Sequence, residues 1–210
     1  MTRSTSRRPA QVKVAFIVEG DKEKHLVEVL AHKVVEQLQP SVTPCFKTIR
    51  LGGPPQIQGL LTVVLILLAR GYERFIVVFG TEGANTRQVS SMLEQIRAPL
   101  VRGGVAEGVV LIPVAPSLER WVLADKESVE RAARKRIPGE RLPRRRHPEQ
   151  LLEELLGGWG EKEQRKVAKL LDPERLHARD GSFALFFRAL QEALAARPRH
   201  AQEKPGHTSP

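Results

Sequence analysis

The stretch Val12 to Val18, VKVAFIV, followed directly by Glu19-Gly20-Asp21, decides the fold class of this chain. An almost continuous apolar run rich in β-branched residues is typical of a central strand buried on both faces. Gly20 ends the run, and Asp21 is a candidate N-cap of a helix. The helix is indicated by apolar residues at helical spacing, namely Leu26, Val29, Leu30, Val34 and Leu38.

The same rhythm continues along the chain. Further strands are predicted at 43–51, 75–79 and 109–114, with helices at about 56–70 and 86–101 between them. The helix at 56–70 is apolar almost all round, so we expect it to be sandwiched between other layers. Strands alternating with helices predict an α/β fold, with a parallel sheet flanked by helices and, beyond Glu119, a helical C-terminal extension.

Composition shifts divide the chain. Residues 1–10 are expected to form a disordered basic tail, residues 11–125 the α/β core, and residues 126–196 a helical extension that contains an Arg- and Pro-rich linker at 131–148. Residues 197–210 are polar and contain proline, and we expect a second disordered tail there.

Composition also excludes several classes of protein. The chain has 210 residues and one cysteine, Cys45, which excludes an internal disulfide framework and a Cys-rich zinc site. The first ten residues lack the apolar run of a secretory signal. The longest apolar run, at 59–69, is shorter than the roughly 18 residues that span a bilayer. We therefore expect a cytoplasmic protein without a membrane segment.

The net charge of +10 is concentrated in two segments. Residues 1–10 contain three Arg and no acid, and residues 131–147 contain seven Arg and one Lys against one Glu, so these segments carry the whole excess. The second segment is a candidate for contact with nucleic-acid phosphates. It lacks interleaved aromatic residues, so base stacking is not indicated. The alternative is a solvated linker. The candidate contact residues are Arg134, Lys135, Arg136, Arg141, Arg144, Arg145 and Arg146.

Three carboxylates follow predicted strands. Glu19 follows the first strand, Glu82 the third and Glu119 the fourth. In open parallel sheets, ligands gather outside the carboxyl ends of the strands. Gathered carboxylates repel one another unless a cation offsets them, and oxygen ligands favour Mg²⁺ or Mn²⁺. The alternative is structural: Glu19 caps a helix, Glu82 lies in a solvated loop, and Glu119 pairs with Arg120 or another neighbour.

The sequence from Phe16 to Glu23, FIVEGDKE, resembles the opening motif of Toprim domains, in which an apolar strand ends in Glu-Gly. The second Toprim motif is an apolar strand that ends in Asp-x-Asp. Its counterpart here is the stretch from Phe75 to Glu82, FIVVFGTE. Gly80 stands in place of the first Asp and Glu82 in place of the second, so one ligand of the motif is missing and the other is longer by a methylene.

A second resemblance covers more of the chain. Glu119 to Asp125, ERWVLAD, is similar to the Glu-x-Trp-x-Leu-Ala-Asp signature of an uncharacterised Toprim-like family, domain of unknown function 4276. The stretch from Gly181 to Phe187, GSFALFF, resembles the C-terminal helix of that family. With the Glu-Gly motif, the similarity extends over roughly residues 12 to 195.

The resemblance implies a Toprim-like fold distantly similar to nucleases of the OLD type, and metal-dependent phosphodiester chemistry on nucleic acid. Glu19 would act as general acid/base or metal ligand, with Glu82 and Glu119 as further ligands of Mg²⁺ or Mn²⁺. Because Gly80 replaces an Asp, one weak metal site or none is expected. An OLD-type ATPase in a bacterial defence or repair setting is the implied partner. The alternative is a catalytically inactive module that binds nucleic acid or an ATPase.

Three residues near these motifs have structural interpretations. Trp121 is expected to anchor the core, because large aromatic residues dominate burial where they are rare. Asp125 is interpreted as a surface cap or as a partner of Lys126 or Arg131. Ser182 is interpreted as the N-cap of the final helix.

Overall fold

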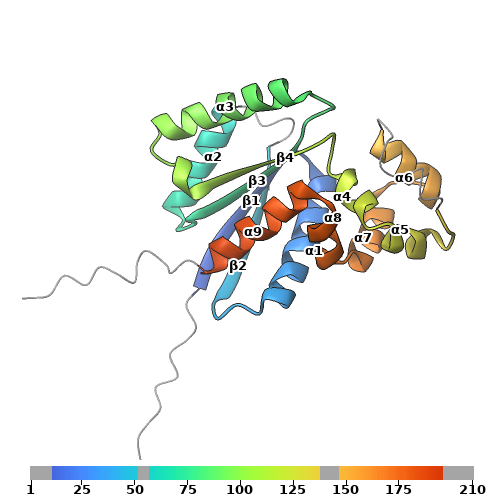
Figure 1. The fold of residues 1–210 in the computed structure, drawn as a ribbon. Helices are drawn as coiled ribbons and strands as arrows, with labels where there is room; N and C mark the ends of the chain where they lie inside the picture. The colour runs from blue at the N-terminus through green and yellow to red at the C-terminus, as the bar shows by residue number, and fades with distance from the viewer. Residues whose placement is uncertain (1–10, 52–56, 138–146, 196–210) are drawn as a thin grey trace, which may run out of the picture.

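The computed structural model describes residues 11–51, 57–137 and 147–195. They form a sheet of four parallel strands: β1 (Gln11–Val18), β2 (Thr43–Arg50), β3 (Arg74–Gly80) and β4 (Val109–Val114). The strand order is β2-β1-β3-β4 (Figure 1). The predicted α/β fold with a parallel sheet is therefore confirmed.

Helices cover both faces of the sheet. The helices α1 (Asp21–Leu38) and α9 (Gly181–Ala195) lie on one face, and α2 (Ile57–Ala69) and α3 (Thr86–Arg102) lie on the other (Figure 1). A short 3₁₀ turn, η1 (Ala106–Gly108), precedes β4. Successive strand residues point to opposite faces, so Phe16 packs toward α1 and α9 while Ile17 packs toward α2 and α3. Burial on both faces explains why the central strands β1 and β3 read as continuous apolar runs.

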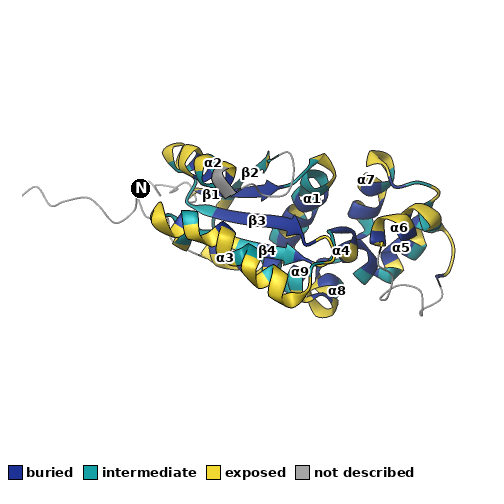
Figure 2. Ribbon diagram, turned by 90° about the horizontal axis from the view of Figure 1, so that it is seen from above, coloured by how far each residue is buried: buried dark blue, intermediate teal, exposed yellow. Residues whose placement is uncertain are grey.

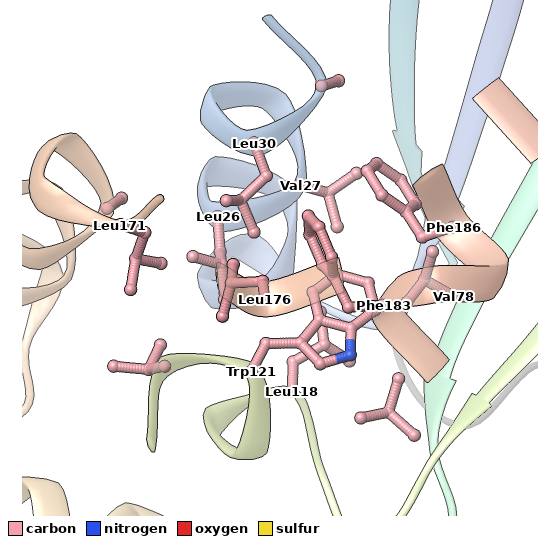
Figure 3. Packing of buried hydrophobic residues seen from close by; sticks show 14 of the residues in the cluster. Leu26, Val27, Leu30, Val78, Leu118, Trp121, Leu171, Leu176, Phe183 and Phe186 are labelled. Atoms are coloured by element: carbon pink, nitrogen blue, oxygen red, sulfur yellow. The ribbon is translucent and has the colours of Figure 1, made fainter. Parts of the chain in front are cut away.

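The remaining helices form a cluster beyond the carboxyl ends of the strands. They are α4 (Glu119–Ala124), α5 (Lys126–Ala133), α6 (Pro148–Leu156), α7 (Glu161–Leu170) and α8 (Pro173–Arg179). One apolar core runs from the sheet into this cluster, as the buried faces in Figure 2 indicate. Side chains of α1, α4 and α9 meet around Trp121 and Phe183, whose rings pack edge to face at 5.2 Å (Figure 3). Trp121 is fully buried, so its predicted role as a core anchor is confirmed.

Three expectations about helices are corrected. The α2 helix is not sandwiched: Leu65 and Ile66 are 47% and 48% exposed, because in the described ranges α2 has the sheet on one side and solvent on the other. Asp21 is not the N-cap of α1, because Gly20 holds that position and Asp21 is the first helical residue. At the start of α9, Asp180 rather than Ser182 caps the helix, since its Oδ1 accepts the backbone N–H groups of Ser182 and Phe183.

Within the described ranges, no helix is long and apolar enough to cross a membrane. The predicted tails at 1–10 and 197–210 and most of the predicted linker lie outside the described residues. The division into a core at 11–125 and an extension at 126–196 stays a prediction. The described part of that extension shares its apolar core with the sheet through α9.

Candidate functional site

The strand order places a site between β1 and β3. The chain leaves β1 toward β2 on one side and leaves β3 toward β4 on the other, so the crevice between β1 and β3 is the switch point at which parallel sheets bind ligands. Glu19 follows β1 there, and its Oε2 accepts a hydrogen bond from the backbone N–H of Gly80 at 3.3 Å. The structure thus joins the ends of the two Toprim-like motifs through one contact.

Glu19 is partly buried and surrounded by charges of its own sign. Burial raises the pKa of its carboxyl group, and the N–H of Gly80 offsets only part of this effect. The carboxylates of Glu23, Glu82 and Glu119 raise the pKa further. Two of these three neighbours, Glu82 and Glu119, are the residues predicted to share the site. A glutamic acid that keeps its proton at higher pH than usual is suited to general acid catalysis.

Glu23 is a member of this cluster that the sequence analysis missed. Its carboxylate lies against the backbone of Gly20, and a Cβ on Gly20 would lie 2.8 Å from Glu23 Oε2. Burial raises the pKa of Glu23, and Glu119 adds to the effect. The available signal was its spacing of four residues from Glu19 at the start of a helix, where a carboxylate three positions into the helix reaches back to the N-cap.

The loop after β3 lies close against Gly80, the residue at which this chain departs from the motif it resembles. The backbone N–H groups of Thr81 and Glu82 both donate to the carbonyl oxygen of Pro116, at 2.8 and 2.9 Å. A Cβ at Gly80 would lie 3.1 Å from this oxygen and 3.3 Å from Glu82 Oε1. Glu82 itself is exposed and has a left-handed φ of 48°. Gly80 therefore occupies a position that a side chain would crowd.

Glu119 lies on the side of the site that faces the C-terminal helices. It is 8% exposed, and its Oε1 accepts a hydrogen bond from Trp159 Nε1 at 3.2 Å. Together with Glu23 and Gln164 it lines a cavity of about 10 Å³, room for about one water molecule. Both polar atoms of the buried Gln164 amide lack a hydrogen-bond partner among the described residues. Gln164 was also missed, because a lone glutamine in a helix gives no signal in sequence.

The carboxylates, as placed, do not form a ready metal site. Among the described residues, no group of three or more His, Cys, Asp or Glu side chains is arranged to hold a metal ion. Glu19 accepts a hydrogen bond from Gly80, Glu119 accepts one from Trp159, and Glu82 lies in the exposed loop after β3. Binding of Mg²⁺ or Mn²⁺ by these carboxylates, which the resemblance implies, stays a prediction.

The Glu-x-Trp-x-Leu-Ala-Asp stretch fastens the C-terminal helices to the core. Trp121 Nε1 donates to Ser182 Oγ at 2.8 Å, just as Glu119 binds Trp159. Asp125 is fully buried and binds Arg175 through both of its oxygens, at 2.8 and 2.9 Å. Three of the signature residues thus contact separate parts of the extension.

The interpretation of Asp125 as a surface residue paired with Lys126 or Arg131 is wrong. Asp125 does cap a helix, as predicted, because it is the N-cap of α5. Its Oδ1 accepts the N–H of Ser128 at the start of α5. Burial alone would raise its pKa, but hydrogen bonds from Arg175, Ser128 and the backbone of Asp172 outweigh burial and lower it. The alternative in which Glu119 pairs with Arg120 is not what the structure shows. Arg120 forms an ion pair with the buried Asp180 at 2.8 Å.

The basic segment is only partly described. Arg134, Lys135 and Arg136 are exposed at and after the end of α5. The other predicted contact residues, Arg141, Arg144, Arg145 and Arg146, lie outside the described residues.

Comparison with family models, with curated proteins and with solved structures gave no match for this chain. The resemblance to Toprim-like proteins accordingly rests on the motif residues quoted above and stays a prediction.

Proposed function

We propose that this protein acts on the phosphodiester backbone of nucleic acid at the carboxyl edge of its sheet, with Glu19 as the acid–base residue. One observation carries the proposal. The Glu19 carboxyl lies at the switch point between β1 and β3, hydrogen-bonded to Gly80 N–H, and burial and three neighbouring carboxylates raise its pKa. A partly buried carboxyl group with a perturbed pKa at the ligand-binding edge of a parallel sheet is a candidate for proton transfer.

In this proposal Glu19 gives a proton to the leaving oxygen of the phosphodiester or removes one from the attacking water. Glu23, Glu82 and Glu119 act through Glu19, because their negative charges favour its protonated form. The Gly80 N–H fixes the orientation of the carboxyl group. The basic residues outside this cluster offset the repulsion between four carboxylates and a polyanion.

The test is strand cleavage of supercoiled DNA, linear DNA and RNA, measured with Mg²⁺, with Mn²⁺ and with a chelator. Glu19→Gln keeps the shape of the side chain and removes its acid–base function. Glu94→Gln, at an exposed position on α3, is the matched control. We expect cleavage by the wild type and by the control, reduced about a hundredfold or more in Glu19→Gln. Cleavage undiminished by Glu19→Gln would refute the role of Glu19.

The second candidate is a catalytically inactive module that binds nucleic acid or an ATPase of the OLD type. The close approach of Pro116 to Gly80 favours it, because an aspartate at this position would crowd the Pro116 carbonyl oxygen. Nucleic-acid binding without cleavage under every metal condition would select this candidate. A partner role predicts that mixing the protein with an ATPase encoded beside it changes the rate of ATP hydrolysis.

A further inference from the structure

The outer side of α7 carries a row of basic side chains. Lys162, Arg165, Lys166 and Lys169 are exposed, and their spacing of three and four residues puts them on one face of the helix. Gln164, Val167 and Ala168 form the opposite, buried face. In Figure 2 the ribbon of α7 carries both exposed residues, in yellow, and buried residues, in dark blue. We refer to these four basic residues as the α7 basic face.

The α7 basic face lines an open hollow at the surface of the protein. Besides the four basic side chains, Glu161 and Leu170 line it, and Glu161 is in an ion pair with Arg165. No aromatic residue is among these lining residues, so the face is suited to phosphate groups and not to stacked bases. The face lies close to α1: burial lowers the pKa of His25 and Arg165 lowers it further, against the opposing charges of Glu28 and Glu161.

The α7 basic face is continuous with the basic end of α5. Lys166 Nζ donates to the carbonyl oxygen of Ala132 at 2.6 Å, and Arg131 donates to that of Leu170 at 2.9 Å. The exposed residues Arg134, Lys135 and Arg136 follow α5. Two basic segments that are far apart in the sequence thus adjoin in the fold.

The same helix borders the carboxylate cluster. Gln164, on its buried face, lines the cavity with Glu23 and Glu119, and Trp159, just before the helix, donates to Glu119. The basic face is therefore separated from the carboxylates by about the width of one helix, roughly 10 Å. From Lys162 to Lys169 the face extends about 10 Å along the axis, enough for roughly three phosphates at 3.4 Å per step of a duplex strand.

We propose that the α7 basic face binds the phosphate backbone of nucleic acid and guides it to the carboxylate edge of the sheet. This inference rests on the proposed function, which makes nucleic acid the substrate, and it adds the surface that binds the nucleic acid. The site then has an attractive part on α7 and a reactive part at Glu19.

The test is binding of short fluorescein-labelled DNA and RNA, single-stranded and duplex, followed by fluorescence anisotropy from about 50 to 200 mM salt. The variant Lys162→Ser/Arg165→Ser/Lys169→Ser removes three charges and keeps Lys166, which contacts Ala132. The control variant Arg87→Ser/Arg97→Ser/Arg102→Ser removes three exposed charges from α3, on the other face of the sheet. Circular dichroism checks that both variants fold.

We expect the α7 variant to bind about tenfold or more weakly, with a salt slope lower by about 2 to 3, and the α3 variant to bind like the wild type. Equal weakening of both variants would reduce the effect to net charge and overturn the inference. Unchanged binding by the α7 variant would also overturn the inference. An acidic protein partner would then be the remaining candidate ligand of the α7 basic face. If the wild type binds no nucleic acid, the proposed function fails as well, so the two failures are distinguishable.

Discussion

At Glu19, burial and three neighbouring carboxylates act in the same direction, and the consequence is a stability that depends on pH. The pKa of Glu19 is raised from its ordinary value of 4.5, so the folded protein binds this proton more tightly than the unfolded chain does. The contribution of the protonated carboxyl to stability is fully present below pH 4.5 and is lost as the pH rises through the folded-state pKa. Glu23 contributes with the same sign.

We therefore predict that Glu19→Gln raises the melting temperature at pH 7, because glutamine imitates the protonated acid at no electrostatic cost. The difference from the wild type should disappear below about pH 4.5, where Glu19 is protonated. Thermal unfolding from acidic to neutral pH measures it, with Glu94→Gln as the control. A Glu19→Gln variant less stable than the wild type at pH 7 would mean that the ionised form of Glu19 is favoured by the fold.

Gly80 is predicted to tolerate a side chain poorly. Gly80→Ala should lower the free energy of unfolding by about 1 to 2 kcal/mol, because its Cβ meets the carbonyl oxygen of Pro116 at 3.1 Å. Gly80→Asp should lower it more, since a carboxylate is added beside Glu19 and Glu82. Urea unfolding measures both changes.

Gly59→Ala is the matched control, because nothing lies within 4 Å of a Cβ at this helical position. It should stabilise the protein by about 0.5 to 1 kcal/mol. If Gly80→Ala were as stable as the wild type, the loop at Pro116 would be able to move away from the added Cβ without a loss of stability. Steric crowding would then not account for the glycine.

At the scale of secondary-structure elements, Asp125 joins α5 to α8. Asp125→Asn removes the charge that binds Arg175 and weakens the contacts of Ser128 and the backbone of Asp172. We predict a loss of about 3 kcal/mol at pH 7, as is usual when one partner of a buried ion pair is removed. Glu127→Gln, which breaks the exposed pair with Arg179, should cost less than about 1 kcal/mol.

The pH dependence of this effect has the opposite sign to that of Glu19. The pKa of Asp125 is lowered from 3.8, so its stabilisation is present above pH 3.8 and is lost as the pH falls through the folded-state pKa. The difference between the wild type and Asp125→Asn should therefore narrow in strong acid. Denaturant unfolding at neutral and acidic pH checks it, and a loss at pH 7 no larger than that of Glu127→Gln would contradict the central role of Asp125.

The elements also show which parts of the fold the sequence predicts. Buried parallel strands leave a strong local signal, since a strand covered on both faces is apolar throughout, and β1 and β3 were predicted close to their observed bounds. Contacts between distant segments leave no such signal. The partner of Asp125 is 50 residues away, and Ser182, which lies inside α9, accepts a hydrogen bond from the distant Trp121 while Asp180 caps the helix.

The candidate site was predictable to the same extent. Glu19, Glu82 and Glu119 follow from the rule that strand ends converge, and the charges of Glu82 and Glu119 both raise the pKa of Glu19. Glu23 needed its position at the start of α1, and Gln164 needed the packing of α7 on α1. The α7 basic face was readable as a helical spacing of Lys and Arg, but its place beside the carboxylates was not.

At the scale of the whole molecule, the sheet and the C-terminal helices share one core. The α9 helix covers the same face of the sheet as α1, and Phe186 packs against Phe16 with ring centres 5.9 Å apart. Residues 11–125 alone lack this cover. Their exposed apolar face would remain in water, and the buried Trp121 would lose Phe183 and Phe186.

We predict that residues 11–125, produced alone, do not form a stable fold, whereas residues 11–195 do. Circular dichroism and thermal unfolding measure the difference: the long form should melt cooperatively and the short form should not. Cooperative melting of the short form would support an independent domain that ends at residue 125, with the helices as an appendage.

The most direct test of the site is the titration of the Glu19 carboxyl itself. Its carbon resonance, in protein with ¹³C-labelled glutamate, is assigned as the signal that Glu19→Gln removes, and its chemical shift is followed against pH. We predict a midpoint above 4.5 that falls when Glu23→Gln or Glu119→Gln removes a neighbouring charge. A midpoint at or below 4.5, or one that neither substitution moves, would contradict a carboxylate cluster centred on Glu19.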